Sequence, residues 1–158
     1  MPRRTPSSIA YVAFVAVLWA VALPAVLIAD SGRGIFPARG VGFITGGVLL
    51  AMGGLALVDA GAHVLAGAGI GLFGVRPGSR LVRTGIYSRV RNPIDIGTVL
   101  LSLAPWVAFD IDLMWVIPAG AIVYFVAGVG PYEDRHLLEA FEGDFRRYRA
   151  AVSKWLPR

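Results

Sequence analysis

Charged and amide side chains gather in the stretch "GIYSRVRNPIDIG", residues 85–97, just where an apolar run begins. Asn92, Pro93 and Asp95 suit the start of a helix, since asparagine is a favoured N-cap and proline a favoured first residue. The N-terminus of a helix also presents unpaired N–H groups and a positive dipole end, which favour anions. The stretch therefore predicts a helix start and, compatible with it, a place for an anionic ligand group.

Two adjacent carboxylates, Glu133 and Asp134, follow another apolar run. Carboxylates at the exit of a membrane-spanning helix are costly to desolvate and need a partner. The candidate partners are the arginines of residues 74–91 or a bound ligand. A second pair, Asp59 and His63, is spaced by one helical turn; with only two ligands in view, a hydrogen-bonded pair is favoured over a metal site. No metal is predicted.

The composition indicates an integral membrane protein. Of 158 residues, 56% are hydrophobic and only 16% are charged, whereas about a quarter are charged in a typical soluble domain. The uncharged run Ile9–Ala29 meets the roughly 20-residue length needed to cross a bilayer. It exceeds the ~7–15 residues of a signal-peptide core and lacks a clean cleavage site, so we interpret it as a retained helix.

Four apolar segments are candidate membrane spans: about Ile9–Ala29, Val41–Val58 with a continuation towards Val64, Pro93–Phe109 and Leu113–Val129. The third and fourth are joined only by Asp110–Asp112, which predicts a tight antiparallel hairpin. Arginines are concentrated before the first span, between the second and third, and after the fourth. By the positive-inside rule, both termini should face the cytoplasm. Gly42 and Gly46 fit a small-residue motif for helix packing.

The segment after the fourth span is amphipathic. Apolar residues recur at three- and four-residue spacing, namely Leu137, Leu138, Phe141, Phe145, Tyr148 and Val152. This period predicts a helix that begins at Pro131 and lies at the membrane surface. The sequence thus predicts an all-α, polytopic transmembrane bundle of about four spans with a C-terminal amphipathic helix, and residues 1–158 form a single integral membrane domain.

The ordered set "LVRTGIYSRVRNPIDIG", a helical hairpin and "EDRHLLEAFEGDFRRYRAAV" resembles the isoprenylcysteine carboxyl methyltransferase and phospholipid methyltransferase superfamily. Its members are membrane enzymes that use S-adenosylmethionine, and S-adenosylhomocysteine is the product. The resemblance covers about Leu65–Pro157. It implies that residues 74–93 and 131–157 form a cytoplasmic cofactor-binding part.

Carried over position by position, the resemblance implies that seven residues bind or border the cofactor: Arg80, Leu81, Val82, Tyr87, Asn92, Pro93 and Glu133. Asn92 and Pro93 stand where the family has histidine and proline, while Asp95 stands where it usually has tyrosine. No catalytic residue is assigned. A carboxylate or thiolate acceptor needs no protein base, whereas for an amine acceptor Asp95, Asp134 and His136 are conceivable bases.

The function expected from the resemblance is methyl transfer to a lipid or small hydrophobic acceptor. The alternative is a non-catalytic membrane protein of the same fold that binds cofactor, lipid or a protein partner. A transporter or channel subunit is disfavoured because no charged residue lies near the middle of a span. The expected partners are the hydrophobic substrate and membrane lipids, with no nucleic acid, because a net charge of +5 in such a chain reports topology and anionic headgroups.

Overall fold

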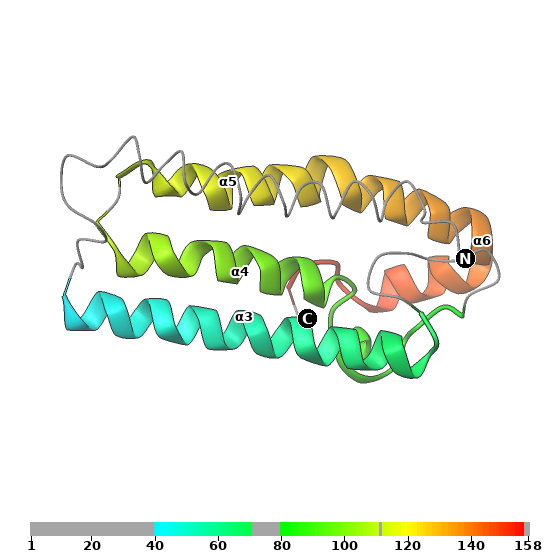
Figure 1. The fold of residues 1–158 in the computed structure, drawn as a ribbon. Coiled ribbons are helices and arrows are strands. Elements are labelled where there is room, and N and C mark those ends of the chain that lie inside the picture. The colour runs from blue at the N-terminus through cyan, green and yellow to red at the C-terminus, as the bar shows by residue number, and fades with distance from the viewer. Residues whose placement is uncertain (1–39, 71–79, 111, 157–158) are drawn as a thin grey trace, which may run out of the picture.

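The computed structural model describes residues 40–70, 80–110 and 112–156, and every element in these ranges is helical (Figure 1). In chain order the elements are α3 (Val41–Gly67), the 3₁₀ turn η3 (Gly85–Ser88), α4 (Pro93–Ala108), the 3₁₀ turn η4 (Asp112–Trp115), α5 (Val116–Val123), the π-helical η5 (Tyr124–Val129) and α6 (Gly130–Ala151). The predicted all-α class is confirmed for this part of the chain. The first predicted span, Ile9–Ala29, lies outside it.

Among the described residues, two helices are long and apolar enough to cross a membrane: Val41–Gly67 and the continuous helix Leu113–Ala151. α4 is a third apolar helix but is shorter, with 16 residues. The predicted second and third segments are therefore confirmed as helices, with α3 running on to Gly67 and α4 ending at Ala108. α4 packs between α3 and α5, and it runs antiparallel to both (Figure 1).

Three glycines of α3, spaced seven residues apart, hold α3 and α4 together. Gly47, Gly54 and Gly61 are the buried residues of α3. A Cβ built on Gly54 would lie 2.7 Å from the carbonyl oxygen of Gly97 and 2.9 Å from the Leu101 side chain. Of the two glycines in the expected packing motif, Gly46 is half-buried, with Val107 of α4 3.5 Å from an added Cβ, whereas Gly42 is exposed with nothing within 4 Å. Seven residues are close to two helical turns, which keeps all three glycines on one face.

Gly54→Leu is expected to separate α3 from α4 and to destabilise the protein by about 2 kcal/mol or more, because the new side chain meets backbone that cannot move aside. The matched control is Gly53→Leu, at an exposed neighbouring position with nothing within 4 Å of the added Cβ. That change should be neutral or slightly stabilising, since leucine has the higher helix propensity. Thermal unfolding of the two purified variants in detergent measures the difference, and equal melting temperatures would contradict the packing described.

The expected break between the fourth span and the tail helix is absent. Val129 and Gly130 keep right-handed helical dihedrals, so the helix continues past Pro131. A proline inside a helix removes one hydrogen bond and crowds the carbonyl four residues earlier. Here the widened π-helical turn Tyr124–Val129 lies just before Pro131. This turn accommodates the missing hydrogen bond, so the helix does not end at the proline.

The tail helix instead bends at Glu142, whose φ of 29° and ψ of −104° are not helical. After the bend, α6 turns back towards the start of α4 (Figure 1). The amphipathic prediction is confirmed for this part, because Phe145 and Tyr148 are buried while their neighbours Arg146, Arg147 and Arg149 are exposed. The bend is what brings residues 145–156 under the polar start of α4.

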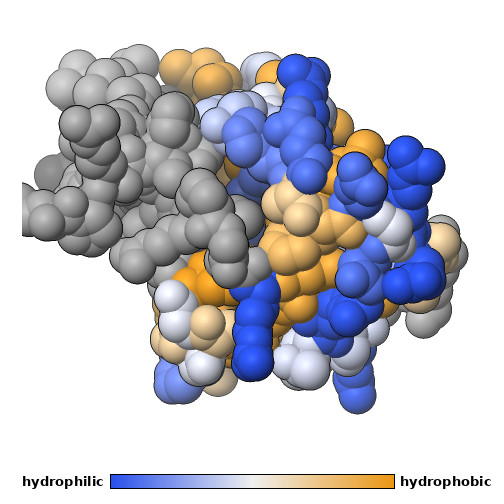
Figure 2. Space-filling model, turned by 90° about the vertical axis from the view of Figure 1, so that its right-hand side faces the viewer, coloured by the Kyte–Doolittle hydropathy of each residue, from blue (hydrophilic) through white to orange (hydrophobic). Residues whose placement is uncertain are grey.

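The end of the bundle where α6 bends carries many charged side chains. Figure 2 looks on to this end and shows blue side chains around a central orange, hydrophobic area. The exposed charged residues near it belong to η3, its flanks and α6: Arg80, Arg83, Arg89, Arg135, Glu139, Glu142, Asp144, Arg146, Arg147 and Arg149. By contrast, α3 exposes large apolar side chains such as Phe43, Leu49 and Met52 along the bundle.

Candidate functional site

The candidate site begins at the start of α4, where Asn92 occupies the N-cap and Pro93 the first helical position, as predicted. The expected capping bond, however, is absent: the Asn92 side chain accepts no hydrogen bond from the helix backbone. Its Nδ2 instead donates to Asp95 Oδ2 at 2.8 Å and lies 3.5 Å from Glu133 Oε2. One amide group thus joins the carboxylates of two elements that are far apart in the sequence.

Asp134 is the centre of a network of ion pairs. Its Oδ1 accepts a hydrogen bond from Arg91 Nη1 at 3.0 Å, and its Oδ2 lies 3.1 Å from Lys154 Nζ. The three side chains are largely shielded from solvent, with exposed fractions of 23% for Asp134, 9% for Arg91 and 16% for Lys154. The prediction that an arginine of residues 74–91 partners one of the two carboxylates is confirmed.

The C-terminal segment after α6 frames the network. Its backbone carbonyls accept hydrogen bonds from the N–H groups just before α4: Arg91 N donates to Ser153 O at 2.9 Å and Asn92 N to Lys154 O at 3.2 Å. Arg91 Nε also donates to Val152 O at 3.2 Å. Arg91 therefore links the tail backbone with Asp134, and its guanidinium lies over the Phe145 ring, 5.6 Å from the centroid.

Lys154 reaches the junction of the fourth apolar segment and α6. Its Nζ donates to Gly130 O at 2.8 Å in addition to the pair with Asp134. A side chain at position 130 would collide with this ammonium, because a Cβ there would lie 2.8 Å from Lys154 Nζ and 2.6 Å from Phe125 O. The backbone oxygen of Phe125 is the stricter of these two contacts, because Lys154 Nζ ends a flexible side chain, so the close approach of Phe125 O is what requires glycine at position 130.

Glu133 lies one turn beyond the apolar part of its helix, which ends at Val129. Within the described residues its one hydrogen-bond partner is the neutral amide of Asn92, while both neighbouring cations contact Asp134 instead. Burial raises the pKa of Glu133 to about 7; the negative charge of Asp95 adds to the shift, and Lys154 opposes it. Glu133 is thus a partly buried carboxylate without a cationic partner of its own in these residues.

Two tyrosines close the site on the side of η3. Tyr87 is buried, and its backbone oxygen accepts a 2.6 Å hydrogen bond from the Tyr148 hydroxyl. Burial raises the pKa of Tyr87, and the charges of Glu133 and Asp95 raise it further, so its hydroxyl lies within electrostatic reach of both. Burial likewise raises the pKa of Tyr148 to about 12. Both rings are neutral at physiological pH.

The structure brings together Tyr87, Asn92, Pro93 and Glu133 among the residues that the resemblance implied. Pro93 is buried at the first turn of α4. The other three residues lie in the irregular segment before η3, where Leu81 and Val82 are half-buried and Arg80 is exposed. Within the described ranges, these three make no hydrogen bond or ion pair with the carboxylate network.

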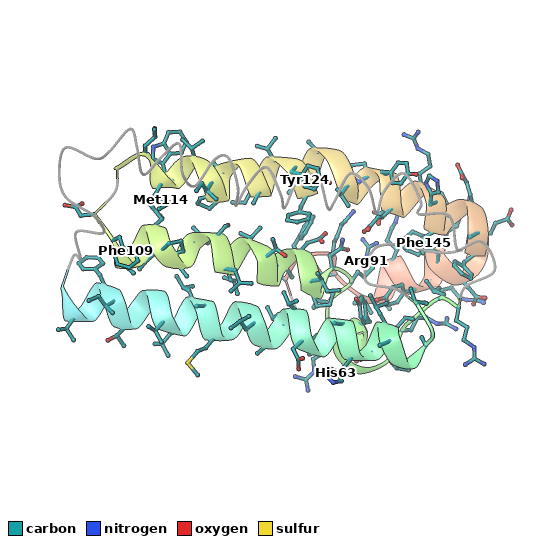
Figure 3. All side chains as sticks on the ribbon, viewed as in Figure 1. His63, Arg91, Phe109, Met114, Tyr124 and Phe145 are labelled. Carbon is teal, nitrogen blue, oxygen red and sulfur yellow. The ribbon has the colours of Figure 1, made fainter. Side chains whose placement is uncertain are left out.

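Sequence reasoning did not single out Arg91 among the arginines of residues 74–91, it missed Lys154 as part of the site, and it did not pair Asp95 with Asn92. Figure 3 shows Arg91 and Phe145 at the end of the bundle where α6 bends. Lys154 had no local signal, because it reaches the network only through the bend at Glu142. Asp59 and His63 form the predicted pair, with His63 Nδ1 3.2 Å from Asp59 Oδ1; both are exposed, and His63 points away from α4 (Figure 3).

Comparison of the chain with protein-family models, with curated proteins and with solved structures gave no match.

Proposed function

We propose that this chain is an S-adenosylmethionine-dependent membrane methyltransferase that acts on a lipid or small hydrophobic acceptor. The observation that carries the proposal is the meeting of Asn92, Asp95 and Glu133 at one point, from two helices separated by a hairpin. These positions belong to the two motifs on which the resemblance rests. If the two motifs were present only by chance, nothing would require their residues to lie in contact.

The donor set suits the cofactor chemically. Glu133 and Asp95 are acceptors for ribose hydroxyls or for an ammonium group, and a carboxylate shielded from water forms strong charge-assisted hydrogen bonds. Tyr87 supplies an aromatic face suited to a cationic sulfonium. When bound, S-adenosylmethionine would supply the methyl group. The chain's own part is to align donor and acceptor and to exclude water, which is the main demand of an in-line displacement.

Asp134 is not a candidate base in this proposal, because its two carboxylate oxygens are already engaged by ion pairs with Arg91 and Lys154. An acceptor such as a carboxylate or thiolate would need no protein base at this site. For an amine acceptor, Asp95, Glu133 or His136 would have to take the proton.

We further propose that the protein is multi-pass, with about four spans and both termini on the cytoplasmic side. The apolar exposed surface of α3, the apolar length of α4 and α5, and the hydrophilic end at α6 support this arrangement. Arginine-rich segments meet at that end, as the positive-inside rule requires for the cytoplasmic face. The cofactor would then enter from water and the acceptor from the bilayer.

Calorimetric titration of S-adenosylmethionine and S-adenosylhomocysteine into detergent-purified protein tests the proposed site. We expect saturable binding of both compounds with one site per chain. Absence of binding to protein that still unfolds cooperatively on heating would refute the cofactor site. Binding without methyl transfer to any acceptor in membrane lipid extracts would favour the alternative, a non-catalytic protein of this fold, for which Asp95 at the usual tyrosine position is the specific argument.

A further inference from the structure

The charges at the start of α4 do not balance. The network joins three carboxylates to two cations: Asp95, Glu133 and Asp134 on one side, Arg91 and Lys154 on the other. Both cations contact Asp134, so its charge is well compensated. Asp95 and Glu133 share only one neutral amide, the side chain of Asn92. The uncompensated negative charge therefore belongs to this pair.

Two ionised carboxylates cannot both remain next to the same amide nitrogen in a shielded site. Asp95 is 7% exposed, and its Oδ2 and the Oε2 of Glu133 both face Asn92 Nδ2. Like charges this close destabilise each other strongly, and such pairs hold one proton between them at neutral pH. Either a proton or the cationic group of a ligand would neutralise one of the two negative charges.

We propose that Asp95 and Glu133 share one proton when the site is empty and release it to solvent when the cationic group of a ligand binds between them. This inference rests on the proposed function for the identity of the ligand, but not for the proton itself. In this inference, Asp95 and Glu133 are the residues of the site that select a positively charged group of the ligand. It also makes ligand binding dependent on pH.

The groups that face Glu133 from each neighbouring element support this assignment. From α4 come Asn92 and Asp95, from η3 comes Tyr87, from α6 comes Asp134, and from the C-terminal segment comes Lys154. Tyr87 is neutral, Asp134 is paired with Arg91 and Lys154, and Lys154 is held by Asp134 and Gly130 O. In the described part of the chain, the Asp95–Glu133 pair is thus the group at this point that titrates near neutral pH, consistent with the pKa of about 7 for Glu133.

The sign of the pH dependence follows directly. Below the pKa, the proton occupies the pair and competes with the cationic ligand, so affinity falls; above it, the pair is free and affinity reaches a plateau. For one competing proton and a pKa of about 7, affinity at pH 8 should exceed affinity at pH 6 by about tenfold.

The test has two arms. In the first, infrared difference spectra of the ligand-free protein are recorded over about pH 5 to about pH 9. We expect a protonated carboxyl band that titrates near neutral pH, remains in the control Glu139→Gln, and is lost in Glu133→Gln. Glu139 is an exposed residue of the same helix, and its substitution leaves the site untouched. Absence of such a band in the wild type, or its persistence in Glu133→Gln, overturns the proposal.

In the second arm, S-adenosylmethionine is titrated calorimetrically at one pH below neutrality in two buffers of different ionisation enthalpy. We expect the binding heat to depend on the buffer, with close to one proton released. Binding without proton release would overturn the inference while leaving the proposed function intact. If S-adenosylmethionine does not bind at all, the proposed function fails, and the infrared arm alone still decides whether the pair holds a proton.

Discussion

Glu133→Ala is expected to weaken binding of S-adenosylmethionine by about 100-fold, with little loss of stability. The side chain would supply a charge-assisted hydrogen bond in a shielded site, worth about 3 kcal/mol. In the ligand-free protein its one described hydrogen bond is the 3.5 Å contact with Asn92, so its removal costs the fold little. Calorimetric titration and thermal unfolding of the same preparation separate the two effects.

The control for this change is Glu139→Ala, which removes an exposed carboxylate six residues along the same helix. It should leave both the affinity and the melting temperature within error of the wild type. Unchanged affinity in Glu133→Ala, with a normal response of the control, would contradict the assignment of Glu133 to the cofactor site.

Arg91→Met is expected to be the most destabilising change in the polar part of the molecule, by about 3 kcal/mol. Arg91 is 9% exposed and connects Asp134, the backbone oxygen of Val152 and the Phe145 ring. Breaking such a shielded ion pair leaves a carboxylate and a carbonyl short of a partner. Arg91→Lys should recover only part of the loss, because an ammonium cannot hold both acceptors in the planar geometry of a guanidinium.

Thermal unfolding in detergent, with Arg89→Met as the control, measures this effect. Arg89 is exposed and lies two residues away, so its replacement should change stability by less than about 0.5 kcal/mol. Equal melting temperatures for the two variants would show that the network around Asp134 contributes nothing to the fold.

The helices were predictable because their signal is local. Apolar length and the start sequence Asn92-Pro93 locate α4 to within one residue at its end, and the apolar run of α3 was found although its C-terminal extension was underestimated. The glycine contact was predicted only in part: Gly46 of the expected motif lies against α4, whereas Gly42 is exposed and Gly47, Gly54 and Gly61 make the closest approach. Which glycines face a partner depends on the rotation of the helix, which the sequence of one helix does not reveal.

The site was predictable only in part, and for a physical reason. An arginine partner for one of the carboxylates after the fourth apolar segment was predictable, because an unpaired charge at the exit of a membrane-spanning helix is costly to desolvate. The choice of Arg91 for Asp134, and the part played by Lys154, depend on the bend at Glu142 and on the continuous helix through Pro131. Nothing in the sequence marks Glu142 as a non-glycine residue with positive φ. The contacts of Arg91 and Lys154 with Asp134 could therefore not be predicted.

The most direct test of the account is methyl transfer itself. The full chain is reconstituted into vesicles made from total membrane lipid extract and incubated with methyl-labelled S-adenosylmethionine, with Glu133→Ala as the inactive control. The account predicts label in an organic-soluble product of the wild type and none above background with Glu133→Ala. Equal label with both proteins, or no label together with no cofactor binding by folded protein, would contradict it.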